Sequence, residues 1–443
     1  MSNKHRIRVD LETLRDTLRA QIINNDLIQK EGLTPITYNI EGGHGIGKTS
    51  MVSQLAEELN KHFVRLNLAT LEELGDLIGM PIQQFEICKK RTVPEEVIVD
   101  VEREVVTPTG PALRIVKQKQ VVMVEEKYDC MFVDAKTYDD YIREGYHPTG
   151  EKRTSYCTPE WIQGKDDGRG GILLLDDHTR ADPRFIQATM TLIETQSYYS
   201  WKLPPGWTIL MTTNPDNGEY FVTPMDDAQT TRYITFEVMF NEEVWARWAE
   251  KAKVDSRCIN FVLLHPEFFK GTEQSGDKKV TTAKTNPRSA GLFFNSIRSI
   301  SDFSNKLELL TLLGEGSVGH EFSIAFSMFI NNRLDKLVSP KDMLLGGNEK
   351  VEELYDCIYK EGKPMAAIAS VLHSRLINYT VNYIEDHKVT PEISDRLEFY
   401  ISDPKSPFTE DLKFNIIKKL IAANRVKFQK LCDKDAVKKM IMA

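Results

Sequence analysis

The sequence has no hydrophobic run long enough to cross a membrane. A membrane-spanning helix needs about 20 mostly apolar residues, and no stretch of the 443 residues approaches that length. The first residues, MSNKHRIRVDLETLR, also lack the apolar core of a secretory signal. We therefore expect a cytoplasmic protein without a membrane partner.

Cysteine is scarce, and no two cysteines form a CxxC pair. This absence argues against a zinc ribbon. Widely spaced cysteines without a pattern are typical of proteins in a reducing compartment. The six residues are Cys88, Cys130, Cys157, Cys258, Cys357 and Cys432.

An excess of positive charge is also absent. The chain has 57 Lys and Arg against 65 Asp and Glu, a net charge of −8, which counts against a general affinity for nucleic acid. The C-terminus is the exception, because nine Lys and Arg from Lys413 onward face only Asp433 and Asp435. The chain length predicts two or three domains, and the C-terminal tail is a basic appendage on an acidic body.

The segment ITYNIEGGHGIGKTSMVSQLAEELN predicts a phosphate-binding loop. A β-favouring run over 36–40 precedes Gly42-x4-Gly47-Lys48-Thr49, and a helical pattern follows it, as the P-loop motif requires. Glycines let backbone N–H groups converge on an anion at a helix N-terminus. Lys48 would reach the β- and γ-phosphates, and the Thr49 hydroxyl would bind Mg²⁺. The alternative is a chance match in a glycine turn, and the flanking strand and helix count against it.

We therefore predict that the protein binds ATP and Mg²⁺. The candidate nucleotide-binding positions are Gly42, Gly43, His44, Gly45, Ile46, Gly47, Lys48, Thr49, Ser50 and Asp176.

A second buried strand ends in two acids. The run over 172–175 is aliphatic, and Asp176 and Asp177 follow it directly. Downstream of a P-loop, such a strand is expected to supply Asp176 to the metal through its water shell and Asp177 to orient the attacking water. The alternative is a strand that simply ends at solvent.

Five β-rich runs, most of them separated by helical patterns, predict an α/β fold with a parallel sheet covered on both faces. Besides 36–40 and 172–175, the runs begin at Phe63, Thr208 and Tyr233. Ligands of such sheets bind at the carboxyl ends of the strands. The P-loop, the two acids and Asn214 each follow the end of a run, so we expect them at one edge. Asn214 could hydrogen-bond the γ-phosphate or the water, although Asn before Pro is also a common turn former.

These residues together resemble the MoxR-like branch of the AAA+ ATPases, which is often paired with von Willebrand factor A proteins. The match runs through EGGHGIGKTS, LEELGDLIGMP, GGILLLDDHTRADPRFIQATMTLIE, LPPGWTILMTTNPDNGEYFVTPMDDAQTTRYITFEV and TNPRSAGLFFNSIRSI. It extends from about residue 34 to 386, and an unmatched segment over about 89–156 interrupts it.

The resemblance implies roles for further residues. Asn214 would be the sensor on the fourth strand, and Arg288 the second sensor at the start of a lid helix. Arg232 would reach the nucleotide of a neighbouring subunit. With Asp177 these are the candidate catalytic residues, while Thr49 and Asp176 are the candidate metal ligands. The resemblance also implies a homo-oligomeric ring, usually a hexamer, that remodels a protein partner in the manner of a chaperone, with a von Willebrand factor A protein as a candidate client.

One residue departs from the family pattern. The family normally has Glu after the metal-binding Asp, and Asp177 is one methylene shorter, about 1.5 Å of reach. A 1 Å misplacement of a catalytic group can cost about 10²-fold in rate, so either the loop lies further inward or the ATPase is slow. His178 is expected to be exposed on a loop, and His44 is assigned no chemical role beyond its place in the loop.

The rest of the chain predicts an insertion, a helical lid and a tail. Two alternating runs, 97–106 and 114–125, flank a turn-rich connection and predict a β-hairpin. Its near-neutral charge favours contact with a protein, and a hairpin that merely covers the sheet is the alternative. The expected divisions are an N-terminal helical segment 1–33, an AAA+ core 34–240 with an insertion at about 89–156, a helical lid region 241–390, and a basic helical tail 391–443 entered through a proline-rich linker.

Three functions follow from these features. The leading hypothesis is a ring-forming AAA+ ATPase that remodels or activates a protein partner. A nucleic-acid motor on the same core remains open but is not favoured, because the hairpin is near neutral and the body acidic. A slow ATP-dependent switch or scaffold is the third hypothesis, because Asp177 is shorter than the Glu usual at this position.

Overall fold

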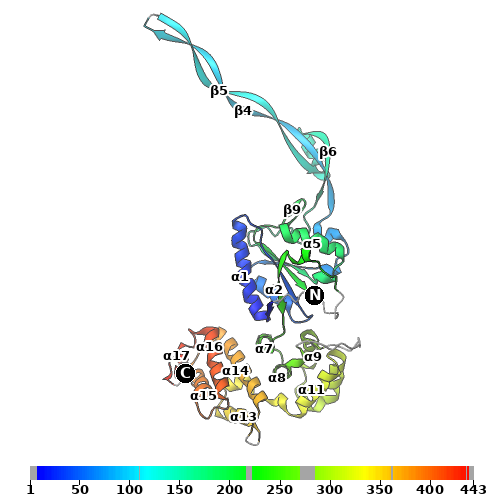
Figure 1. Ribbon diagram of the computed structural model, residues 1–443, viewed down its shortest axis with the longest axis vertical. Helices are drawn as coiled ribbons and strands as arrows, with labels where there is room; N and C mark the ends of the chain where they lie inside the picture. The colour runs from blue at the N-terminus through cyan, green and yellow to red at the C-terminus, as the bar shows by residue number, and fades with distance from the viewer. Residues whose placement is uncertain are drawn as a thin grey trace.

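A computed structural model of the chain describes residues 7–108, 110–215, 222–269, 285–360, 363–435 and 437–438. Figure 1 shows three parts: an α/β body in the middle, a long β-ribbon projecting from one end, and helices α7 to α17 at the other. The resemblance to the MoxR-like ATPases extends over residues that the structure does not describe, among them 216–221 and 270–284.

The body is built on a six-stranded sheet in which every strand pair is parallel. The predicted parallel α/β fold is confirmed, and all five predicted strands are present. The predicted strand number is wrong, because a short N-terminal strand, β1, pairs with β11 at the edge. In sheet order the strands are β1 (Ile7–Val9), β11 (Tyr233–Val238), β2 (Thr37–Gly42), β10 (Trp207–Thr213), β7 (Gly171–Asp176) and β3 (His62–Asn67).

Helices cover both faces of the sheet, and the alternation of side chains along β7 shows why. Ile172 and Leu174 pack on one face with α1 (Leu11–Lys30) and α2 (Lys48–Glu58). Leu173 and Leu175 pack on the other face with α5 (Pro183–Thr195) and α3 (Leu74–Ile78). Because successive residues of a strand point to opposite faces, a strand buried on both sides must be apolar throughout. The body also contains short elements, η1 (Leu68–Thr70), η2 (His178–Arg180), β8 (Ser197–Tyr198), β9 (Trp201–Lys202) and α6 (Asp227–Thr230).

The insertion forms a separate three-stranded antiparallel sheet in the order β5-β4-β6. The predicted hairpin is present and is longer than the sequence pattern indicated, since β4 (Pro81–Thr107) pairs with β5 (Gly110–Asp134) along its length. Helix α4 (Ala135–Arg143) and strand β6 (His147–Tyr156) complete the insertion. Because β6 pairs only with the first part of β4, from Pro81 to Cys88, the remainder leaves the body as a two-stranded ribbon (Figure 1).

Two cysteines are joined at the base of this ribbon. Cys88 on β4 lies opposite Cys130 on β5, and the two form a disulfide. Sequence spacing could not reveal it, because the residues are 42 positions apart and meet only through the register of the hairpin.

The described part of the helical region contains two large hydrophobic clusters and a small one, formed by Ala246, Ala249 and Ile259. The first is rich in Phe, and Phe261, Phe322 and Phe326 lie at its centre with ring centroids 4.8 to 6.2 Å apart. Its elements are α7 (Glu242–Lys251), α8 (Ser256–Leu264), η3 (Pro266–Phe268), α9 (Pro287–Ile297), η4 (Ser304–Lys306), α10 (Leu307–Ser317), α11 (His320–Asn331) and η5 (Leu334–Lys336).

The second cluster joins residues on both sides of the expected boundary at 390. Pro391 does not begin a linker. It is the first residue of a helix whose Thr390 cap accepts a hydrogen bond from the Ile393 N–H, and Pro is well suited to that position. The elements are α12 (Pro340–Leu345), α13 (Asn348–Ile358), β12 (Tyr359–Lys360), β13 (Lys363–Pro364), α14 (Ala366–Asp386), α15 (Pro391–Ser402), α16 (Glu410–Asn424) and α17 (Gln429–Cys432).

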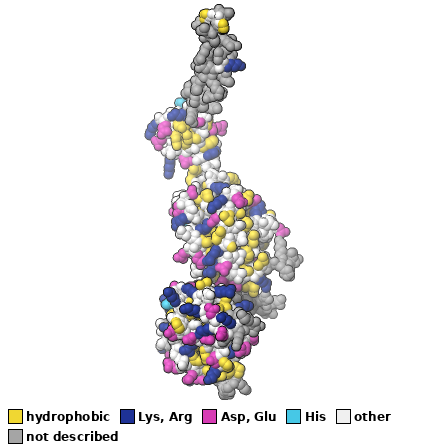
Figure 2. Space-filling model, turned by 90° about the vertical axis from the view of Figure 1, so that its left-hand side faces the viewer, with side chains coloured by type: hydrophobic (Ala, Val, Ile, Leu, Met, Phe, Trp, Pro, Cys, Tyr) yellow, Lys and Arg dark blue, Asp and Glu magenta, His cyan; other side chains and the backbone are white. Residues whose placement is uncertain are grey.

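Among the described residues, no helix is both long and apolar enough to cross a membrane. On the face shown in Figure 2, acidic and basic side chains are interspersed over the body and the helical region.

Candidate nucleotide-binding site

The glycine-rich loop joins β2 to α2 at the carboxyl edge of the sheet. Gly42 is the last residue of β2, and α2 begins at Lys48. Gly45 has a φ of +76° and Gly47 a φ of +102°, a region that side chains with a Cβ rarely adopt. The loop therefore turns sharply into the helix N-terminus, where free N–H groups and the helix dipole favour an anion.

Lys48 folds back over this loop. Its Nζ donates to the carbonyl oxygens of Gly42, at 2.5 Å, and Gly43, at 3.0 Å. Burial lowers the pKa of Lys48 to about 8, the charges of Asp177 and Asp176 oppose that shift, and the charge of Arg288 adds to it. Asp176, Asp177 and Arg288 therefore each lie within electrostatic reach of Lys48.

Asp176 is the most heavily bonded residue of the site. Its side chain is 5% exposed, and Thr49 Oγ1 lies 3.2 Å from both carboxylate oxygens. Thr212 on β10 donates to Oδ1. Arg65 on β3 donates from Nε to Oδ2 at 2.6 Å. The structure thus brings together Thr49 and Asp176, the two candidate metal ligands, whereas the contacts of Thr212 and Arg65 were not predicted.

Next to Asp176, Asp177 and Asn214 are hydrogen-bonded to each other. Asp177 has a φ of +53°, and its N–H donates to Thr212 Oγ1 at 3.0 Å. Asn214 is buried, and its Nδ2 donates to Asp177 Oδ1 at 3.4 Å. The Asn214 N–H donates to Thr179 Oγ1 at 3.3 Å. The loop after β7 therefore presents the Asp177 carboxylate to the amide of Asn214.

His178 is not exposed, contrary to expectation. Its side chain is buried, and Nε2 lies 3.0 Å from Thr189 Oγ1 on α5. Burial lowers the pKa of His178 to about 4, so the ring is neutral at pH 7. It packs under the loop, and the turn at Asp177 directs it inward.

The N-terminus of α9 brings Arg288 to the P-loop. Asn286 caps this helix and accepts hydrogen bonds from the N–H groups of Arg288 and Ser289. A Cβ built on Gly45 would lie 2.6 Å from Asn286 Oδ1 and 2.8 Å from Arg288 Cβ, so glycine is required for this approach. His44 Nε2 lies 3.1 Å from Asn286 Nδ2. His44 therefore links the loop to the helical region, a role that the sequence did not indicate.

Ile46 and Ser50 have other surroundings. The Ile46 side chain lies against Gly42 at the end of β2, and Ser50 is exposed on the first turn of α2.

Arg232 lies far from the P-loop of its own chain. It directly precedes Tyr233, which pairs with Thr37 at the start of β2, whereas the P-loop follows Gly42 at the end. Five residues of parallel strand span about 16 Å. Arg232 Nε instead donates to Glu194 Oε2 at 3.1 Å. The structure therefore does not bring Arg232 together with the other predicted site residues.

The residues that are present suit Mg²⁺ and a nucleotide phosphate. Mg²⁺ prefers oxygen ligands and is commonly held by one or two carboxylates together with waters and phosphate oxygens. The Thr49 hydroxyl and the Asp176 carboxylate supply that donor set next to the phosphate loop. No group of three or more His, Cys, Asp or Glu that could hold a metal occurs in the part of the chain that the structure describes.

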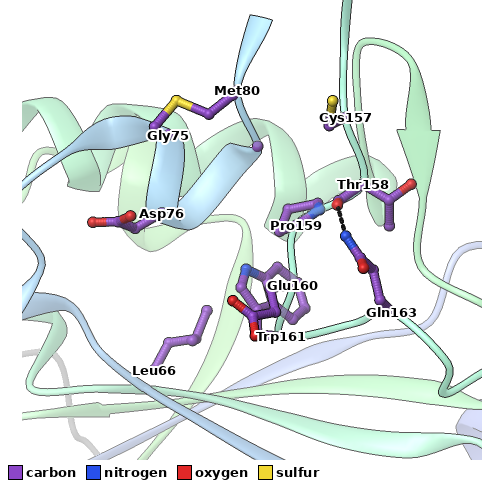
Figure 3. A pocket seen from close by; sticks show the side chains of 11 residues that line it. Leu66, Gly75, Asp76, Met80, Cys157, Thr158, Pro159, Glu160, Trp161 and Gln163 are labelled. Atoms are coloured by element: carbon purple, nitrogen blue, oxygen red, sulfur yellow. Dashed lines mark hydrogen bonds between the residues drawn. The ribbon is translucent and has the colours of Figure 1, made fainter. Parts of the chain in front are cut away.

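A cavity of about 710 Å³ lies next to this edge of the sheet, between α3 and the segment 157–163. Figure 3 shows Leu66, Met80 and Trp161 among the side chains that line it. Trp161 Nε1 donates to the carbonyl oxygen of Leu77 at 3.1 Å. No residue of the P-loop and neither acid of the candidate site contributes to its lining, so this cavity is separate from the candidate site.

The solved structures that are similar to this chain include two whose sequence identity to it is low. No protein-family model matches the sequence, and no curated protein matches it. The structure of C. elegans PCH-2 is 12% identical over 72% of this chain and 68% of that chain, with a TM-score of 0.28. The Thermotoga maritima RuvB Holliday junction branch migration motor is 12% identical over 86% of this chain and 90% of that chain, with a TM-score of 0.34. Similarity at this level carries no argument about function, so the functional case depends on the site.

Proposed function

We propose that this protein is a Mg²⁺-dependent ATPase of the AAA+ class. The contact between Thr49 and Asp176 is the observation that carries the proposal. It joins two oxygen ligands, from segments 127 positions apart, directly beside a glycine loop that ends in Lys48. Bound Mg²⁺ would neutralise charge on the phosphates.

The surrounding residues have assignable roles in hydrolysis. Lys48 would exchange its bonds to the Gly42 and Gly43 carbonyls for phosphate oxygens. Asp177, oriented by Asn214, would hold the attacking water. Arg288 would transmit nucleotide binding to α9, because the N-terminus of this helix lies directly against Gly45.

We further propose that the active form is a ring, hexameric by the MoxR-like resemblance, that remodels a protein partner. The position of Arg232 supports the ring, since it is too distant to serve its own P-loop and could serve that of a neighbour. The β4–β5 ribbon supports contact with a partner. Isolated two-stranded ribbons are marginally stable in water, so contact with another protein would stabilise it.

Replacement of Lys48 tests the nucleotide site. We expect Lys48→Ala to lose most ATP binding or turnover, because no neighbour replaces a point charge on the γ-phosphate. A fluorescent ATP analogue is titrated against both proteins, and phosphate release is measured in parallel. Lys30→Ala, at the exposed end of α1, is the control. Unchanged affinity together with unchanged hydrolysis in Lys48→Ala would refute the assignment.

A slow switch is the second candidate, and a specific contact favours it. Asp177 is short for a residue that orients water, and its carboxylate is already engaged by Asn214. A protein that binds ATP and hydrolyses it very slowly would show the same geometry.

A further inference from the structure

Arg65 occupies a position that no P-loop role explains. It extends from β3, one of the two edge strands of the sheet, and its Nε lies 2.6 Å from Asp176 Oδ2. The arginine side chain is 49% exposed, whereas the Asp176 side chain is 5% exposed. A charge buried to that degree requires a partner, and Arg65 is the cation bonded directly to it.

The two carboxylate oxygens of Asp176 are fully engaged by protein donors. Oδ1 accepts from Thr212 and lies near Thr49, and Oδ2 accepts from Arg65 and lies near Thr49. A hydrated Mg²⁺ needs these same oxygens, either directly or through its waters. It would also place a second positive charge beside the guanidinium group.

Arg65 is free to leave without disturbing the fold. Its ion pair with Asp176 is the only side-chain hydrogen bond that Arg65 makes to the described residues, and half of the side chain already faces solvent. Thr49 and Thr212, by contrast, are attached to α2 and β10 inside the body and cannot withdraw. Of the three donors, Arg65 is therefore the one whose side chain can move away from Asp176.

We propose that Arg65 is a positioning residue that neutralises Asp176 while the nucleotide site is empty and must release Oδ2 before Mg²⁺ and nucleotide bind. Arg65 thereby sets the Mg²⁺ concentration at which nucleotide binds. This inference rests on the proposed nucleotide site.

The test measures binding rather than turnover. A fluorescent, non-hydrolysable ATP analogue is titrated in EDTA and in increasing Mg²⁺, which gives the Mg²⁺ concentration for half-maximal binding. We expect Arg65→Gln to lower this concentration about tenfold, since it removes a charge-assisted hydrogen bond that competes for the same oxygen. Arg65→Lys keeps the charge but not the planar guanidinium, so its Mg²⁺ requirement should lie between those of wild type and Arg65→Gln.

The structure provides a matched control. Arg169, just before β7, also donates from Nε to an Asp, at 2.8 Å to Asp167 Oδ2, and its side chain is 48% exposed. Arg169→Gln should leave the Mg²⁺ requirement unchanged. The affinity for Mn²⁺ with ADP, measured from the electron paramagnetic resonance signal of free Mn²⁺, provides an independent readout and should rise in Arg65→Gln alone.

The outcomes separate this inference from the proposed function. If wild type binds the analogue with Mg²⁺ and Arg65→Gln needs the same or more Mg²⁺, then Arg65 does not compete for Asp176 and the inference fails alone. If wild type shows no Mg²⁺-dependent binding, the proposed function fails and the inference with it. Thermal unfolding of each variant shows that the comparison is made between folded proteins.

Discussion

Asp177 is the residue on which hydrolysis depends most directly in the proposed site. It follows the metal-side acid, adopts a left-handed backbone conformation and accepts a hydrogen bond from Asn214. The turn and the hydrogen bond from Asn214 fix the position of the short carboxylate, which the sequence does not show. The structure is therefore compatible with a working Asp at a position where the MoxR-like pattern has Glu.

We expect Asp177→Asn to lower ATP hydrolysis by about 10²-fold or more without loss of ATP binding, because a group that orients the water acts mainly in the transition state. Asp177→Glu should keep or raise the rate. Steady-state phosphate release and analogue binding are measured for each protein, with Asp166→Asn, an exposed acid before β7, as control. The slow-switch alternative predicts negligible turnover in wild type and no further loss in Asp177→Asn.

At the scale of elements, α14 couples the stability of the helical region to pH. His373 lies inside this helix, and its Nε2 is 3.0 Å from the carbonyl oxygen of Leu412. Burial lowers the pKa of His373 to about 4, Leu412 and Glu243 oppose the shift, and Lys419 adds to it. Because an unfolded histidine has a pKa of about 6.5, the unfolded chain binds more protons than the folded chain between these values. Stability should therefore fall as the pH decreases from about 6.5 to about 4.

His373→Gln should reduce this pH dependence. Between pH 7 and pH 5 the wild-type histidine is expected to cost about 2 kcal/mol of unfolding free energy, and Gln does not titrate. Denaturant unfolding at the two pH values measures the difference, and His387→Gln, at the exposed end of the same helix, is the comparison. His178, whose pKa is also near 4, is present in both variants and contributes the same pH dependence of stability to each. An unchanged loss between pH 7 and pH 5 in His373→Gln would contradict the assignment.

At the scale of the whole molecule, Arg232 connects the single chain to the proposed ring. It lies near the amino ends of the parallel strands, whereas Lys48 lies near their carboxyl ends, and it pairs with Glu194. If it completes the site of a neighbour, each active centre needs Lys48 from one subunit and Arg232 from the next. The ring hypothesis can therefore be tested by mixing two defective subunits.

We expect Lys48→Ala and Arg232→Ala to be nearly inactive separately, since an arginine supplied in trans contributes on the order of 10³ to 10⁵ in rate. In mixed rings some interfaces would combine an intact Lys48 with an intact Arg232, so activity should partly return. ATP hydrolysis is measured across mixing ratios, with co-assembly shown by pull-down of a tagged subunit. Flat activity at every ratio, in rings shown to be mixed, would exclude a shared site.

The P-loop and the five strands β2, β3, β7, β10 and β11 could be predicted because their signals are local. The glycine spacing before Lys48 and the continuous apolar run before Asp176 follow from backbone freedom and from burial on both faces of a sheet. The convergence of the loop, the two acids and Asn214 could also be predicted, since parallel strands place their carboxyl ends together. Arg288 lies beside the P-loop, and only a family resemblance singled it out in the sequence.

Some features were determined only by the tertiary structure, because they arise from contacts between segments far apart in the sequence. Arg65 reads as an ordinary exposed strand residue, yet it pairs with an acid 111 positions away. Strand β1 has three residues and no periodic signal of its own, and only its pairing with β11 makes it a strand. Cys88 meets Cys130 through hairpin register, and His178 is buried because a turn directs it under the loop. Each of these depends on which segments, distant in the sequence, lie side by side in the fold, and the local residue pattern does not contain that information.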